Sequence, residues 1–283
     1  MKNSVYDLFL ECFPQFDMTR DIFFRLIDID KCRIITHSEN SSIVGTAVLK
    51  DNTVRLVCVR PDFRGRGIGT DLMLKAEKIA ADNGFDKIII GGGSNLFIGA
   101  VTPYEQWKDG SNKFFERLGY SFYGKYTDMK IITAGFDLES LNIPKCPSGI
   151  SFEYIAADRR EEIIEAVKKV DDDWAQYFTF DCPIFAALAD GKTAGFCIVG
   201  ENEENILSSG KNKVGSIGCV GVVPEMRRGG IGLEMVGRAA MDLKKRGCEE
   251  IFIHYTHLEN WYGKLGAETF LRYVFCEKNI SAK

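Results

Sequence analysis

Short apolar runs of strand type occur in two series along the chain, and segments with helical apolar periodicity separate them. The first series predicts strands over residues 32–36, 43–49, 54–59 and 87–90, with a helix over 69–81 that ends at Asn83-Gly84. The second predicts strands over 150–155, 184–188, 194–199 and 213–223, with a helix over 159–170 and another after the last strand. Several strands in succession before a helix favour mostly antiparallel sheets, and the pattern predicts a fold of the α/β (α+β) class.

The two series contain copies of one segment. Residues 56–90 and 219–253 align without a gap, and 11 of their 35 positions are identical. The identities include Pro61/Pro224, Arg64/Arg227, Gly67/Gly230, Ile68/Ile231 and Gly69/Gly232. A chain of 283 residues is long enough for two domains of ordinary size. We therefore expect domains at residues 1–140 and 148–283, with the boundary in the Pro- and Gly-containing stretch between Ala134 and Ser148.

An Arg- and Gly-rich turn of the form R-x-x-G-x-G occurs in both copies. Glycines let the backbone approach a ligand, the helix that follows offers unpaired N–H groups at its positive end, and Arg side chains bind phosphate oxygens. The turns consist of Arg64, Gly65, Arg66, Gly67, Ile68 and Gly69, and of Arg227, Arg228, Gly229, Gly230, Ile231 and Gly232. A Walker loop is excluded because no Lys-Ser or Lys-Thr follows, and a dinucleotide fingerprint because Arg stands in place of its first Gly.

Composition narrows the classes of partner. The net charge is −4, from 36 basic and 40 acidic residues, which argues against duplex nucleic acid but not against a small anion. Nine Cys without a C-x-x-C pair, together with three His, predict no metal site. The N-terminus lacks a signal-peptide pattern and no apolar run approaches 18 residues, so we expect a cytoplasmic protein without a membrane span.

The whole pattern around each turn, V-x-V-x-P-[DE]-[FM]-R-x-x-G-I-G followed by a helix, resembles motif A of the GNAT acetyltransferase superfamily. The resemblance implies two tandem GNAT-like domains, each a mixed, mostly antiparallel twisted sheet flanked by helices. It also implies that the turns hold the pyrophosphate of acetyl-CoA. The backbone of the preceding strand, at Val59 and at Val222 and Val223, is then expected to pair with pantetheine.

A second segment resembles the family's pattern [LF]-Y-x-[KR]-[LF]-G-[FY], at residues 261–267 and 114–120. In this resemblance Tyr262 takes the place of the Tyr that protonates the departing thiolate, and a phenol can act as such an acid. Phe115 stands there in the first copy and cannot donate a proton. Two departures weaken the match, since Tyr255 replaces an Asn and Gly263 weakens the helix. The alternative is that the Tyr262 ring only fills the core.

The segment between the first two helices lines the acceptor pocket in the family, and here it spans residues 170–178. Asp173, Trp174 and Tyr177 are its candidates for binding an amine. The alternative is that the carboxylates of this segment cap a helix and face solvent, with Trp174 in the core. The strand over residues 214–223, before the second turn, carries no acid and so supplies no base. Glu225 lies in the turn itself, where solvation is its expected role. His254 and His257 stand close to the proposed thioester site, and either can relay a proton or serve only structurally.

The first copy carries 16 more residues than the second after its last matched strand, since 29 residues lead from Ile90 to Gly119 but only 13 from Ile253 to Gly266. This Gly-rich, aromatic segment, around residues 91–107, is either a binding wall or an interdomain spacer. It contains Tyr104, an alternative proton donor if the first half is active.

The resemblance implies an N-acetyltransferase that transfers the acetyl group of acetyl-CoA to a small-molecule amine by direct attack. Backbone N–H groups near Val222 are expected to stabilise the oxyanion, with the second half catalytic. The first half is then a copy that binds CoA or shapes the acceptor cleft. The alternatives are a non-catalytic acyl-CoA-binding regulatory protein and an enzyme whose first half is active. We expect a monomer or a homodimer.

Overall fold

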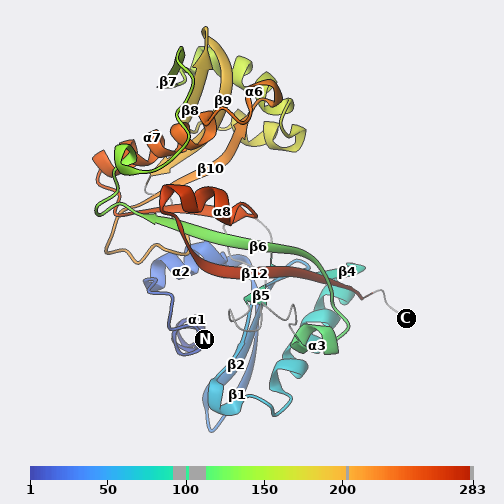
Figure 1. Ribbon diagram of the computed structural model, residues 1–283. Coiled ribbons are helices and arrows are strands. Elements are labelled where there is room, and N and C mark those ends of the chain that lie inside the picture. Colours follow the sequence, from blue (N-terminus) through green and yellow to red (C-terminus); the bar gives the residue numbers. More distant parts are fainter. Residues whose placement is uncertain (92–99, 102–112, 202–203, 281–283) are drawn as a thin grey trace. The chain divides into compact units, whose positions relative to one another are not determined.

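The computed structural model describes residues 1–91, 100–101, 113–201 and 204–280 (Figure 1). Most of the extra segment of the first copy, Tyr104 included, lies outside the described residues. The chain forms two compact units. Unit 1 comprises residues 1–126, 204–211 and 271–283, and unit 2 comprises residues 127–203 and 212–270. Among the described helices, none is long and apolar enough to cross a membrane.

Unit 1 is a sheet with helices on both faces. Its helices are α1 (Lys2–Cys12), α2 (Arg20–Ile27), α3 (Ile68–Asp82) and α5 (Lys113–Arg117). Its strands are β1 (Arg33–Glu39), β2 (Ser42–Lys50), β3 (Thr53–Val59), β4 (Lys87–Ile90) and β5 (Ala100–Val101), with parts of β6 (Ser121–Ile132) and β12 (Glu268–Asn279). The strands follow the order β1-β2-β3-β4-β12-β6, and only the described β3–β4 pair is parallel.

Helix α3 illustrates why these elements form. Gly67 precedes it with a φ of 81°, a left-handed conformation that suits glycine. Its buried side chains recur every three to four residues, at Leu72, Met73, Ala76 and Ala80, and pack on the sheet. The helix ends at Asp82, beside the predicted Asn83-Gly84 stop.

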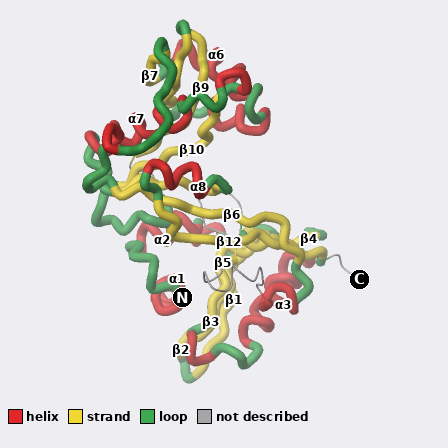
Figure 2. Tube along the Cα trace, viewed as in Figure 1, coloured by secondary structure: helices red, strands yellow, loops and turns green. Residues whose placement is uncertain are grey.

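Unit 2 repeats this plan with helices on both faces of its sheet (Figure 2). Its helices are α6 (Arg160–Lys168), α7 (Ile231–Lys245) and α8 (Glu259–Tyr262), with a 3-10 helix, η5, over Asp172–Thr179. Its strands are β7 (Ile150–Tyr154), β8 (Ile184–Ala189), β9 (Lys192–Glu201), β10 (Val214–Val222) and β11 (Glu250–Thr256), in the order β6-β11-β10-β9-β8-β7. Alternate side chains of β8 and β9 enter two separate cores, one under α7 and one under α6. The described β10–β11 pair is parallel and the other pairs are antiparallel.

The last strand of each sequence copy completes the sheet of the other unit. Strand β6 comes from the first copy, but its residues 129–132 pair with β11 of unit 2. Strand β12 ends the second copy, but its residues 276–279 pair with β4 of unit 1. Two ion pairs anchor β12 there, because Lys278 Nζ lies 2.8 Å from Glu77 of α3, and Glu277 lies 2.9 Å from Lys87 Nζ.

The compact units therefore differ from the halves 1–140 and 148–283 read from the repeat. Residues 127–140 group with unit 2, whereas residues 204–211 and 271–283 group with unit 1. The physical reason is the exchange of β6 and β12. A strand's sequence specifies which face is buried but not which neighbour it pairs with, so the repeat could not reveal the exchange.

Candidate active site

A cleft of about 490 Å³ in unit 2 brings the second Arg/Gly turn together with Tyr262. Six predicted cofactor residues line it: Val222, Arg227, Arg228, Gly230, Ile231 and Gly232. Trp261, Leu258 and Lys264 from the α8 region complete the same wall. Two predicted residues do not line the cleft, namely Gly229 and Val223, and Val223 is buried in the core under α6.

The end of β10 lines the cleft with Val220, Gly221 and Val222, beyond the part of the strand that pairs with β11. The two strands pair over Val214–Ser216 and Glu250–Phe252, near the start of β10. Further along, β10 bulges against β9 between Gly218 and Gly221, and Cys219 adopts a φ of 47°. A bulge re-aims the backbone of its strand, so the N–H and C=O groups of β10 beyond it are directed differently from those of a regular ladder.

Both repeated arginines hold their turns through the backbone. Arg227 Nε donates to the carbonyl of Val222 at 3.0 Å, and Arg64 Nε donates to the carbonyl of Val59 at 2.9 Å. The same bond thus ties each turn to the end of the preceding strand. It fixes the backbone N–H groups at the start of α7 and of α3, where the positive end of the helix favours an anion.

Tyr262 is 6% exposed and belongs to the core under α7. Its ring packs edge-on against Trp261, with 4.7 Å between centroids. Burial, with the nearby thiols of Cys197 and Cys219, raises the pKa of the Tyr262 hydroxyl. The hydroxyl therefore stays protonated at neutral pH and can donate a hydrogen bond. Tyr262 is thus part of the core and also part of the cleft wall, and its role as the acid stays a prediction.

The segment that joins the two sequence copies covers the second turn. A Cβ built on Gly230 would lie 2.6 Å from the carbonyl oxygen of Pro144, and one on Gly229 would lie 3.4 Å from the Pro147 ring. Pro144 also lines the cleft. The joint is therefore a wall of the site rather than a passive connector.

Gly230→Ala is expected to destabilise the protein more than Gly67→Ala does. Both glycines have a φ near 80°, where a Cβ costs about 1–2 kcal/mol. Only at Gly230 does the new methyl also meet a backbone oxygen, that of Pro144. Thermal denaturation followed by circular dichroism should show a melting temperature lower by at least about 4 °C in the Gly230 variant than in its matched partner. Equal losses would show that Pro144 does not cover the turn.

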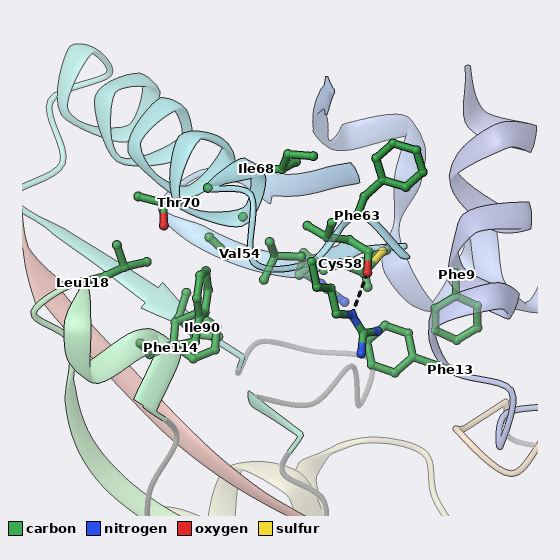
Figure 3. A pocket seen from close by; sticks show the side chains of 18 of the residues that line it. Phe9, Phe13, Val54, Cys58, Phe63, Ile68, Thr70, Ile90, Phe114 and Leu118 are labelled. Carbon is green, nitrogen blue, oxygen red and sulfur yellow. Dashed lines mark hydrogen bonds between the residues drawn. The ribbon is translucent and has the colours of Figure 1, made fainter. Parts of the chain in front are cut away.

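The corresponding cleft of unit 1 has a volume of about 570 Å³ (Figure 3). Phe9 of α1 and Phe13, which follows that helix, lie on one side of it, and Ile90, Phe114 and Leu118 lie on the other. The predicted residues that line it are Val59, Arg64, Gly65, Gly67, Ile68 and Gly69, with Phe115 also in the lining. Among the described residues, no atom comes within 4 Å of a Cβ built on Gly65 or Gly67. The first turn is therefore more open than the second.

Two arginines of unit 1 differ from the sequence prediction: Arg66 was expected to bind the cofactor, and Arg55 was given no role. Arg66 is absent from the cleft lining, because its guanidinium donates to the carbonyl of Asp62 at 2.9 Å and lies 4.7 Å from the Phe63 ring. Arg55, which the sequence reading did not single out, does line the cleft and is 4% exposed. It donates to the carbonyl of Leu26 at 2.8 Å, and burial lowers the pKa of its guanidinium.

The candidate acceptor residues do not meet Tyr262 in the cleft. Asp171 caps η5, since its side chain accepts a hydrogen bond from the N–H of Asp173 at 3.0 Å. Asp173 is exposed, Tyr177 is 46% exposed, and Trp174 packs against the core under α6. None of Asp173, Trp174 and Tyr177 lines the cleft of unit 2. The cap is thus present, and the amine site at these residues stays a prediction.

A polar pair in unit 2 includes a residue that the sequence reading missed. Asp128 of β6 is fully buried, and its Oδ1 lies 2.8 Å from Nδ1 of His254 on β11. Asp128 is 126 positions from its partner, and only the exchange of β6 brings the two together. No local signal could have identified it. Among the described residues, no group of three or more His, Cys, Asp or Glu gathers as a metal site.

Comparison with known proteins identifies the family. The model of the acetyltransferase (GNAT) family matches residues 2–120 and 152–267. A mycothiol acetyltransferase of Saccharomonospora viridis is 24% identical over 234 residues, which cover 75% of this chain and 69% of that protein.

Solved structures share the fold over almost the whole chain. The glucosamine N-acetyltransferase region of a fungal multi-domain GH3 β-N-acetylglucosaminidase has a TM-score of 0.74 at 20% identity. The match covers 98% of this chain but only 37% of that one. A tandem GNAT protein from the clavulanic acid biosynthesis pathway has a TM-score of 0.63 at 14% identity, with 100% and 95% of the two chains covered. The predicted resemblance is confirmed: the chain belongs to the acetyltransferase (GNAT) family, and it is an acyltransferase with a tandem GNAT fold.

Proposed function

We propose that the chain transfers the acetyl group of acetyl-CoA to the amine of a small molecule, and that unit 2 performs the chemistry. One observation carries this proposal. A single cleft is lined both by the turn at the positive end of α7 and by Tyr262, whose hydroxyl stays protonated at neutral pH. A phosphate site and a proton donor in one cleft are what acyl transfer from a CoA thioester requires.

The acyl donor would be held along the cleft. The N–H groups of Ile231 and Gly232, at the start of α7, would bind its pyrophosphate, with Arg228 adding charge. The backbone of β10 up to Val222 and Val223 would pair with pantetheine. Gly232 fits this role, because a Cβ there would lie 3.1 Å from the Trp261 ring and would narrow the cleft.

The acceptor amine would then attack the thioester carbon directly. Its lone pair forms the new C–N bond, while backbone N–H groups of β10 stabilise the oxyanion. The C–S bond breaks and its electron pair leaves on sulfur. Because burial raises the pKa of Tyr262, its hydroxyl donates a hydrogen bond to the developing thiolate throughout the neutral range.

The two acetyltransferases named above suggest which amines to test first. The names of these relatives refer to mycothiol and to glucosamine, at 24% and 20% identity. We therefore propose a small-molecule amine as acceptor, with D-glucosamine, L-lysine and spermidine as a first panel. Thiol release from acetyl-CoA with any of them distinguishes an enzyme from a protein that only binds acyl-CoA.

The open turn of unit 1 favours a second candidate function for that unit, acyl-CoA binding without chemistry. Its cleft is the larger of the two, and no described atom crowds Gly65 or Gly67. Phe115, which is 5% exposed, lines this cleft where unit 2 has Tyr262, and a phenyl ring donates no proton.

Paired variants should show which turn serves turnover. We expect Arg227→Ala to raise the KM for acetyl-CoA about 10- to 100-fold, since it removes a charged hydrogen-bond donor that holds the turn. Arg64→Ala should weaken acetyl-CoA binding to unit 1 in calorimetry and leave turnover unchanged. Arg227→Lys is the matched control that keeps the charge without the fork geometry. Loss of turnover in Arg64→Ala alone would instead make unit 1 the active half.

A further inference from the structure

Asp128 and His254 form a carboxylate–imidazole pair in unit 2. Asp128 Oδ1 lies 2.8 Å from His254 Nδ1 and accepts a hydrogen bond from the N–H of Tyr255 at 2.9 Å. The Asp128 side chain is fully buried, whereas that of His254 is 23% exposed. A carboxylate at this distance favours a proton on Nδ1, which would leave Nε2 as the basic nitrogen of the ring.

A β-bulge produces this geometry. Strand β11 pairs Ile253 with Met129 and Thr256 with Thr127, so His254 and Tyr255 both stand opposite Asp128. Tyr255 adopts a φ of 61°, which is strained for an aromatic residue. Such strain persists only where the surroundings impose it, and here the buried carboxylate holds the backbone N–H of the strained residue.

His254 and Tyr262 approach the parting strands from opposite faces of the sheet. Ile251 and Ile253 of β11 belong to the core under α7, together with Tyr262. Side chains alternate along a strand, so Phe252 and His254 face the other way, and their rings stack with centroids 5.4 Å apart.

His254 stands beyond the part of β11 that pairs with β10, although neither it nor Asp128 is among the residues that line the cleft of unit 2. The last pair between β10 and β11 is Ser216 with Phe252. His254 comes two residues later, beyond the point at which the strands part. A thioester held between the parted strands would thus have the phenol on one side and the imidazole on the other.

We propose that His254 is the general base that accepts the proton of the attacking amine, and that Asp128 is the positioning residue that orients it. This inference rests on the proposed function. As the C–N bond forms, the amine proton moves to Nε2 of His254, and the C–S electron pair leaves on sulfur, where the thiolate is hydrogen-bonded by Tyr262. The imidazolium then returns its proton to water.

Charge around the ring suits this role. Asp128 supplies a negative charge beside the imidazolium that forms. On the same face of the two strands, Lys130 and Glu250 form an ion pair with each other. Their charges offset one another.

The test compares His254→Gln with His257→Gln, an exposed histidine three residues away. The assay is thiol release from acetyl-CoA with the panel amine that the wild-type protein turns over fastest. We expect His254→Gln to lower kcat about 10²-fold or more, with the KM for acetyl-CoA unchanged, and His257→Gln to retain wild-type kcat. Imidazole added to His254→Ala should restore part of the rate, which a merely structural histidine would not allow.

The tautomer of His254 and the rate of an Asp128 variant test the positioning role of Asp128 separately. The chain has three histidines, so long-range ¹H–¹⁵N spectra of the wild-type protein can resolve the tautomer of each ring. We expect His254 to carry its proton on Nδ1, and Asp128→Asn to lower kcat at least about 10-fold with imidazole unable to restore it. A wild-type His254 protonated on Nε2 would overturn the positioning role.

The outcomes separate the two proposals. No thiol release by the wild-type protein with any panel amine would overturn the proposed function, and the base role with it. Turnover in the wild type with an unchanged kcat in His254→Gln would overturn the base role alone.

Discussion

Tyr262→Phe is expected to lower kcat about 10²-fold, the usual scale for a positioned acid, while the affinity for acetyl-CoA is kept. In free energy this is roughly 2.7 kcal/mol of lost transition-state stabilisation. The substitution removes one oxygen and leaves the ring that packs edge-on against Trp261, so the core under α7 should remain intact. Stopped-flow or steady-state detection of released thiol measures the effect.

The control for this variant is Phe115→Tyr in unit 1, which places a phenol at the matching position of the other cleft. It should leave the wild-type rate unchanged, because the proposed base and the acceptor site are in unit 2. Full activity in Tyr262→Phe, with normal thermal stability, would remove the acid from the mechanism.

A chain that ends at Phe270 is expected to lose the fold of unit 1 while unit 2 stays folded. The deleted part of β12 carries five buried side chains of unit 1, namely Leu271, Tyr273, Val274, Phe275 and Cys276. At about 1.5–3 kcal/mol each, their loss is on the order of 8–15 kcal/mol. That is comparable to the whole stability of a domain, about 5–15 kcal/mol.

Hydrogen exchange read by mass spectrometry distinguishes the units. Peptides from α3 should lose protection in the shortened chain, and peptides from α7 should keep it. Asn279→Ala, an exposed substitution in the same strand, is the matched control and should change neither. Protected α3 amides in the shortened chain would mean that the β12–β4 pairing is dispensable.

Local elements could be read from the sequence because their signals are local. The helix predicted over 69–81 spans Ile68–Asp82, since a left-handed Gly67 begins it and Asn83-Gly84 ends it. Strand β4 has the predicted bounds, Lys87–Ile90. The segment predicted as helix up to residue 170 ends at Lys168, and a 3-10 helix follows. The tandem GNAT fold was also predicted, because the repeated turn is a long and specific motif.

Features that depend on pairing between distant segments could not be read. Asp128 lies in the last strand of the first copy, where nothing in the local sequence distinguishes it. Its partner His254 belongs to the second copy. The contact of Pro144 with Gly230 likewise depends on the path of the joint, which composition does not specify. Both features determine the candidate site, so the fold was more predictable than the chemistry.

The exchange of β6 and β12 has a consequence for how the protein is made. Domains of a growing chain generally fold in order as the ribosome releases them, beginning at the N-terminus. Unit 1 cannot follow this order, because β12, which pairs with β4, is synthesised after all the other described strands. Unit 2 has all of its strands as soon as Phe270 emerges. Unit 1, which contains most of the N-terminal half of the sequence, is therefore expected to complete its folding after unit 2.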